Sequence, residues 1–91
     1  MIHFIWDRFN EDKNLIKHNI GISEAESAFF DSSSVTFLDI EHSTASETRY
    51  ICIGKSNKEQ ILFVSFTYRN EKIRIISVRP ANKREKAEHY Y

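Results

Sequence analysis

The amino-acid sequence predicts an α+β fold, a single domain in which helices pack on a mostly antiparallel sheet. Two observations support this prediction. Three β-rich runs joined by short polar connectors fill residues 49–79, as in an antiparallel meander. Helix-forming segments stand before and after that meander, which is typical of α+β domains. The predicted order is β-α-α-β-β-β-β-α over one domain, residues 1–91.

Length and composition indicate one ordered domain. A chain of 91 residues leaves no room for a second core, since a domain of this size buries only about 60 to 65% of its unfolded surface. Cys52 is the only cysteine and sits in an apolar run, so we expect a buried thiol and no intramolecular disulfide. The start of the chain shows neither a basic leader nor a long apolar stretch. We therefore expect no signal peptide, no membrane helix and a cytoplasmic location.

The first predicted elements are a strand and a helix. Residues 2–6 are short, apolar and aromatic, and Asp7 then offers a side-chain oxygen that can cap a helix over residues 8–18. Asn19 and Gly21 tolerate a positive φ and are expected to end this helix.

A second helix and a second strand follow. Residues 23–26, Ser-Glu-Ala-Glu, fit a capping box for a helix that ends at Phe30. Three serines then indicate a turn, and residues 35–40 are expected to form a strand. The polar stretch 41–47 is predicted to be a loop that brings Glu47 to the start of the next strand, as the rim of an active site.

The last half of the chain predicts three strands and a helix. The strands are expected over residues 49–54, 60–69 and 72–79. Asn70-Glu71 is expected to form the tip of a tight hairpin. Pro80 cannot donate to a sheet and marks the end of the last strand, and residues 82–91 have helix-forming composition.

Alternation along the last strand predicts which residues share a face of the sheet. One face is expected to hold Ile73, Ile75, Ser77 and Arg79, and the other Lys72, Arg74, Ile76 and Val78. Each face is then apolar in its middle and polar at one end.

Charge is distributed unevenly along a chain with no net charge. Residues 69–88 hold seven Lys or Arg against three Glu, giving +4, whereas residues 1–68 hold six against ten, giving −4. Such a local basic patch indicates contact with a polyanion. The alternative is that Lys83, Arg84 and Lys86 form only the solvated face of the last helix.

The sequence lacks the residues that a metal site, a nucleotide-binding loop or a hydrolase site would need. The four histidines show no zinc-type spacing and no CxxC accompanies them, so no metal site is expected. Two glycines are too few for a nucleotide-binding loop or a hydrolase elbow. No cofactor is predicted.

Arginines at the ends of strands are the strongest candidates for binding phosphate. Arg49 and Arg79 present fixed donor forks that suit this anion. The alternative is an ion pair in which Glu47 or an Asp neutralises Arg49. Tyr68, Tyr90 and Tyr91 are the aromatic residues expected to be exposed and able to stack on bases.

A series of short motifs in a fixed order resembles a known family. They are Trp6-Asp7, Asn14-x-x-Lys17-His18, Glu24-Ala25, Phe30-Asp31, Glu47-x-Arg49, Gly54, Arg74-Ile75-Ile76-Ser77-x-Arg79 and Arg84-Glu85. The chain closely resembles the BrnT family of type II toxin-antitoxin toxins from about residue 4 to residue 90.

This resemblance implies a RelE-like ribonuclease fold and an RNA cleavage that blocks translation. It also implies a co-encoded ribbon-helix-helix antitoxin, a two-plus-two assembly with it, and contact with operator DNA only through it. By this resemblance, the polar positions that the family shares correspond to Lys17, His18, Glu47, Arg49, Ser77, Arg79 and Arg84. The chain departs from the family at Asn10, where many relatives carry Lys, and at Gly21-Ile22, which replaces a common Ser-Phe.

Metal-free RNA cleavage gives these residues a hypothetical division of roles. The 2′-hydroxyl attacks the phosphate, so the site needs a base, an acid and cations. We assign proton transfer to His18 or Glu47 and the phosphate to Arg49 and Arg79. The residues expected to contact RNA are Lys17, Tyr68, Arg69, Arg74, Ser77 and Arg84.

His18 lies near the predicted end of a helix, where the dipole suits it to the acid role. The alternative is that Lys17 and His18 only bond the last carbonyls of that helix.

Two other functions stay open at this point. A non-catalytic module could bind RNA or the ribosome, or serve with the antitoxin as a corepressor on operator DNA. Such a binder needs Arg49 and Arg79 but has no use for a titrating His18 or Glu47. An unrelated structural domain would have neither a growth effect nor a partner.

Overall fold

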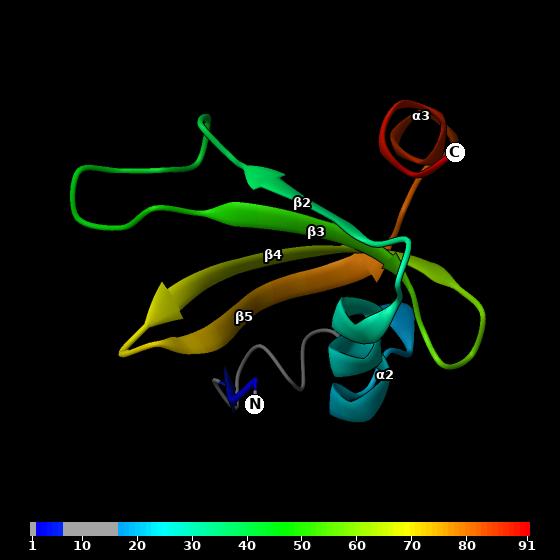
Figure 1. The fold of residues 1–91 in the computed structure, drawn as a ribbon, viewed down its shortest axis with the longest axis horizontal. Helices are drawn as coiled ribbons and strands as arrows, with labels where there is room; N and C mark the ends of the chain where they lie inside the picture. Colours follow the sequence, from blue (N-terminus) through cyan, green and yellow to red (C-terminus); the bar gives the residue numbers. More distant parts are fainter. Residues whose placement is uncertain (1, 7–16) are drawn as a thin grey trace.

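A five-stranded sheet with short helices on both of its faces forms the fold (Figure 1). The computed structural model describes residues 2–6 and 17–91. The strands are β1 (Phe4–Trp6), β2 (Val35–Leu38), β3 (Tyr50–Lys55), β4 (Ile61–Arg69) and β5 (Lys72–Pro80). The helical segments are α2 (Ile22–Ser27), η1 (Ala28–Phe30), α3 (Lys83–Glu85) and η2 (Lys86–Tyr90), of which η1 is a 3₁₀ turn and η2 a π turn.

The strand order is β1-β5-β4-β3-β2, in which β5 with β4, β4 with β3 and β3 with β2 are antiparallel pairs, and β1 is parallel to β5. The predicted α+β class and the meander are confirmed, and β3, β4 and β5 begin and end within one residue of the predicted limits. Asn70 and Glu71 both have positive φ, at 52° and 64°, as a tight hairpin requires. The predicted helix over residues 8–18 and its Asp7 cap lie outside the described residues, apart from Lys17 and His18, which are helical.

One face of the sheet packs against α2 and η1 and is called the α2 face below (Figure 1). Its core comes from alternate residues of β3, β4 and β5 together with Ile20, Ala25 and Ala28. Cys52 lies buried in this core, as predicted, and burial raises the pKa of its thiol to about 11. Gly54 lets the helix approach, because a Cβ placed there would lie 2.3 Å from the carbonyl oxygen of Ala28.

The opposite face, called the α3 face, is covered at one end by the C-terminal helix (Figure 1). Ala81 and Tyr90 pack there against the apolar residues Ile51, Ile53, Ile61, Val35, Phe37 and Phe63. Asn82 begins this helix with a complete capping box, in which its side chain accepts from the Glu85 amide at 2.8 Å. The predicted C-terminal helix is therefore confirmed, while Tyr90 is packed rather than exposed.

A β-bulge at Ile76 changes the predicted faces of β5. Ile75 pairs with Phe66 and Ser77 pairs with Ser65, so Ile76 is an extra residue without a partner in the register. Beyond it the alternation reverses, and Val78 joins Ile73 and Ile75 in the core of the α2 face. Ser77 and Arg79 therefore share the α3 face with Arg74, and the strict alternation predicted from the sequence is wrong.

Three smaller predictions also need correction. Helix α2 begins at Ile22 after Gly21, and no side chain caps it, so the capping box at Ser23 is not formed. Gly21 has φ −87°, whereas Asn19 does adopt the expected positive φ of 56°. The strand predicted over residues 35–40 ends at Leu38, because the chain turns at the following residues into a hydrogen-bonded loop.

Candidate functional site

Four residues on adjacent strands or directly beyond their ends form a line across the α3 face, which we call the polar row: Asp39, Arg49, Thr67 and Arg74. Leu38 pairs with Tyr50 and Tyr50 with Phe66, so the next residues along, Asp39, Arg49 and Thr67, lie opposite one another. The amide of Asp39 donates to the carbonyl of Arg49 at 2.8 Å, and Thr67 pairs with Arg74. Residues opposite each other in a sheet project to the same side, so the row gathers three charged side chains and one threonine from four strands or strand ends.

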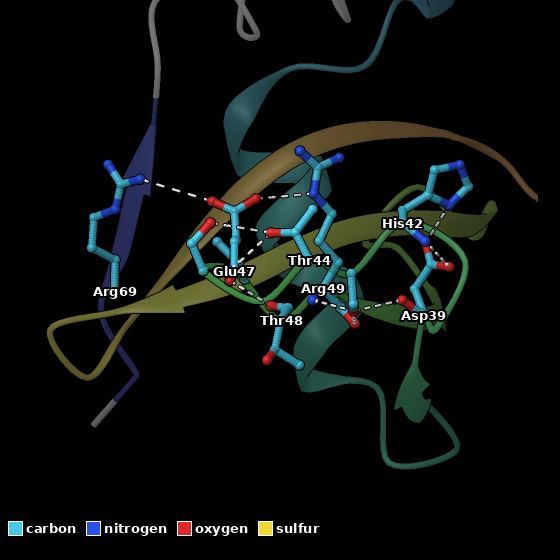
Figure 2. A network of polar contacts seen from close by, with 10 residues as sticks. Asp39, His42, Thr44, Glu47, Thr48, Arg49 and Arg69 are labelled. Atoms are coloured by element: carbon cyan, nitrogen blue, oxygen red, sulfur yellow. Dashed lines mark hydrogen bonds and ion pairs between the residues drawn. The ribbon is translucent and has the colours of Figure 1, made fainter.

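The loop between β2 and β3 holds this row in place through its own hydrogen bonds (Figure 2). The Ser43 hydroxyl accepts from the Arg49 amide at 2.9 Å and donates to the Asp39 carbonyl at 2.6 Å. The amide of Glu47 donates to the Thr44 hydroxyl at 3.1 Å, and the buried Thr67 hydroxyl donates to the Thr48 carbonyl at 2.6 Å. As predicted, the polar loop brings Glu47 to the start of the third strand.

Glu47 lies between two arginines (Figure 2). Its Oε1 is 3.0 Å from Nε of Arg49, and its Oε2 is 4.0 Å from an Nη of Arg69. The ion pair that the sequence left open for Arg49 is thus formed. Arg74, opposite Thr67, places a third arginine on this face.

Arg79 lies apart from this cluster, which corrects the expectation that it meets Glu47 and Arg49 at one rim. It pairs with Phe63, and the four steps along β4 from Phe63 to Thr67 correspond to about 13 Å. Its guanidinium lies over the Phe63 ring and makes a bidentate contact with Glu85 at 2.8 and 2.7 Å. This contact raises the pKa of Arg79 and lowers that of Glu85. Ser77 lies between Arg79 and the polar row, opposite Ser65.

The other predicted site residues are dispersed. Within the described part of the chain, no hydrogen bond or ion pair joins Lys17 or His18 to Glu47, Arg49 or Arg79, and the nearby Ile20 belongs to the core of the α2 face. Tyr68 projects from the α2 face, where it is 54% exposed and packs edge-on against Tyr50. Arg84 is on the C-terminal helix and pairs with Glu88 at 2.9 Å.

Sequence reasoning missed Asp39, which belongs to the polar row, and His42, which lies next to it. The Nδ1 of His42 is 2.8 Å from Oδ2 of Asp39 (Figure 2). Their signal in the sequence is an Asp-x-x-His spacing at the point where a strand gives way to a polar loop. Spacing rules for zinc ligands pass over this pair, because they look for several ligands rather than for one histidine and its partner carboxylate.

Residues 2–6 and 17–91 show neither a cluster of metal-ligating side chains nor a helix that could span a membrane. No group of three or more His, Cys, Asp or Glu side chains in this part of the chain could hold a metal ion together. No helix there is long and apolar enough to cross a membrane.

The fold and the site together define a class of protein. It is a small α+β domain that carries arginines and acid-base groups on one face of its sheet. Residues 6–85 match the family model described as ribonuclease toxin, BrnT, of type II toxin-antitoxin system. Because that match spans most of the chain, the protein belongs to the BrnT family of ribonuclease toxins.

A solved structure shows the same fold. The crystal structure of the Brucella abortus ribonuclease toxin BrnT is similar with a TM-score of 0.66 and 24% sequence identity, over 91% of this chain and 100% of that one. A search of curated proteins gives no match.

Proposed function

We propose that this toxin is a metal-independent endoribonuclease that cuts RNA through attack by the neighbouring 2′-hydroxyl. The observation that supports this proposal most directly is the position of Glu47 between Arg49 and Arg69, at the end of the α3 face away from the C-terminal helix. A carboxylate can accept the proton of the 2′-hydroxyl, and guanidinium groups can stabilise the charge that develops on the phosphate.

The arrangement of the α3 face also suits an extended strand of RNA. From the polar row, Ser77 and then Arg79 continue along the same face toward the C-terminal helix, where Arg84 is exposed. Arg79, about 13 Å from the row by strand geometry, is at a distance suited to a phosphate beyond the scissile one. We therefore give Arg49 the reacting phosphate and Arg79 a binding role.

The wider biology follows from the family and is proposed with the activity. Cleavage blocks translation in the cytoplasm, and a ribbon-helix-helix antitoxin neutralises the toxin in a two-plus-two assembly. Operator DNA is contacted only through that antitoxin. We also propose a relation to the RelE-like ribonuclease fold.

The decisive experiment incubates purified toxin, freed from its antitoxin, with RNA in EDTA. We expect fragments that end in a 2′,3′-cyclic phosphate and a 5′-hydroxyl, and no cleavage where the 2′-hydroxyl is methylated. Arg49→Ala should abolish most of the activity, while Lys58→Ala, an exposed cation in the β3–β4 turn, serves as the control. RNA that is bound but stays intact at protein excess would support the non-catalytic binding module instead.

A further inference from the structure

We propose that His42 is the general acid of this reaction and that Asp39 positions it. The inference rests on the proposed RNA cleavage, and it replaces His18 in the acid role. Three points support it: the contact between the two side chains, the place of Asp39 in the polar row, and the chemistry that the site still needs.

The carboxylate of Asp39 fixes the His42 imidazole from one side. Its Oδ2 is 2.8 Å from Nδ1 of His42, and its Oδ1 accepts from the His42 amide at 3.4 Å. The carboxylate is mostly buried, with the Asp39 side chain 14% exposed, whereas that of His42 is 65% exposed. Since Nδ1 is occupied by Asp39, the other ring nitrogen, Nε2, is the one presented to solvent (Figure 2).

Asp39 itself is rigidly held beside the phosphate-binding arginine. Its amide donates to the Arg49 carbonyl, and its own carbonyl accepts from Ser43, which also anchors the Arg49 amide. Residues opposite each other on antiparallel strands have Cβ atoms about 5 Å apart on one side of the sheet. Arg49 therefore has Glu47 on one side and the Asp39–His42 pair on the other (Figure 2).

Cleavage at such a site needs a proton donor across the phosphate from the base. The 2′-oxygen forms a bond to phosphorus while Glu47 takes its proton. The bond from phosphorus to the 5′-oxygen breaks, its electron pair goes to that oxygen, and His42 Nε2–H supplies the proton. The products are a 2′,3′-cyclic phosphate and a 5′-hydroxyl, and both side chains then exchange protons with water. A carboxylate at Nδ1 orients the ring and leaves Nε2 as the nitrogen that faces the substrate, as in other Asp–His pairs.

A substrate with sulfur in place of the bridging 5′-oxygen tests this assignment, because a thiolate leaves without being protonated. We expect His42→Ala to slow cleavage of the oxygen substrate by about 100-fold or more, in the range known for general acids. On the sulfur substrate the same variant should cut within a few-fold of wild type. Glu47→Gln should be slow on both substrates, since its proton transfer concerns the 2′-hydroxyl.

Asp39→Asn tests the positioning role and should give a smaller loss on the oxygen substrate, with the same recovery on sulfur. His3→Ala is the matched control, because it changes an exposed histidine beside β1, at the opposite edge of the sheet from β2. Both His42→Ala and His3→Ala should keep the thermal stability of wild type.

Three results would overturn the assignment. A His42→Ala enzyme that is equally slow on both substrates would show a structural role, and one that is fast on both would show no role. Recovery on sulfur by His18→Ala in place of His42→Ala would return the acid role to His18. In all three cases wild type still cuts RNA, whereas a wild type that cuts neither substrate would overturn the proposed function as well.

Discussion

The hydroxyl of Tyr90 donates a 2.6 Å hydrogen bond to Oδ2 of Asp31, joining the last turn of the chain to the turn after η1. The same carboxylate accepts from the amides of Lys55 at 2.7 Å and Ser33 at 3.0 Å. The contact with Tyr90 is the main reason that the pKa of Asp31 is lowered and that of Tyr90 is raised to about 12. One carboxylate thus ties the C-terminal helix to the end of β3.

Removing the Tyr90 hydroxyl should loosen the C-terminal helix. We expect Tyr90→Phe to lower the free energy of unfolding by about 1–2 kcal/mol, because the Asp31 carboxylate loses a charge-assisted hydrogen bond at a partly exposed site. Denaturant unfolding monitored by circular dichroism measures the change. Tyr91→Phe is the control, since Tyr91 is 82% exposed. Equal losses in the two variants would contradict a specific role for the Tyr90–Asp31 bond.

The lowered pKa of Asp31 predicts a loss of stability in acid. A carboxyl whose native pKa lies below its unfolded value of about 4 contributes stability above that pH, and this contribution disappears as pH falls through the native pKa. Glu85, whose pKa is lowered mainly by its hydrogen bond to Arg79, acts in the same direction. Unfolding free energies from pH 6 to pH 2 should therefore fall more steeply for wild type than for Asp31→Asn. Parallel curves would exclude Asp31 as a source of this dependence.

Gly54 is expected to tolerate no side chain. Alanine there would place its Cβ 2.3 Å from the Ala28 carbonyl oxygen, so the helix or the strand has to shift, at a cost of about 2–3 kcal/mol. Gly21→Ala is the matched control because nothing lies within 4 Å of its added Cβ, and we expect a change within about 1 kcal/mol. Thermal unfolding of the two variants measures the difference. Similar melting temperatures would contradict the close approach of η1 to β3.

Replacing Arg49 and replacing Arg79 should impair RNA cleavage in different ways. Arg49→Ala removes the cation next to Glu47 and should lower the single-turnover cleavage rate by about 100-fold or more, with a smaller effect on RNA affinity. Arg79→Ala, in a different part of the α3 face, should instead weaken RNA binding severalfold while the rate at saturating protein stays near that of wild type.

Single-turnover titrations of the two variants separate these effects. The same loss of saturating rate in Arg79→Ala would place Arg79 at the reacting phosphate after all. Antitoxin binding by both variants provides the control for correct folding.

Much of the sheet could be predicted because its signals are local. Alternating apolar runs, the Asn70-Glu71 tip and Pro80 each mark a strand or its end without help from distant residues. The start of α2 was harder to predict from the sequence. Ser23 has the right residue type for a cap, but the helix starts at Ile22 after Gly21, with no side-chain cap. Local pattern alone does not decide between two adjacent starting points.

The candidate site was only partly predictable, because it depends on register. The pairing of Glu47 with Arg49 follows from their closeness in sequence, and the ion pair was foreseen as an alternative. The pairing of Arg79 with Glu85 is set by the turn after Pro80, and the place of Asp39 beside Arg49 is set by the pairing of β2 with β3. Tyr68 was expected near RNA from its neighbour Arg69, yet adjacent residues in a strand project to opposite faces.

Because of the extra residue at Ile76, the alternation of side chains between the two faces reverses partway along β5. This reversal changes how related sequences should be compared. In residues 72–75 the odd positions belong to the core, whereas in residues 77–80 the even position Val78 does. In a relative without this extra residue, the counterpart of Arg79 stands one position earlier in the sequence and still projects from the α3 face, because it keeps its place opposite the counterpart of Phe63. A shift of one residue between two relatives at this point therefore conserves the basic surface rather than abolishing it, and matching arginines column by column would misread it as a loss.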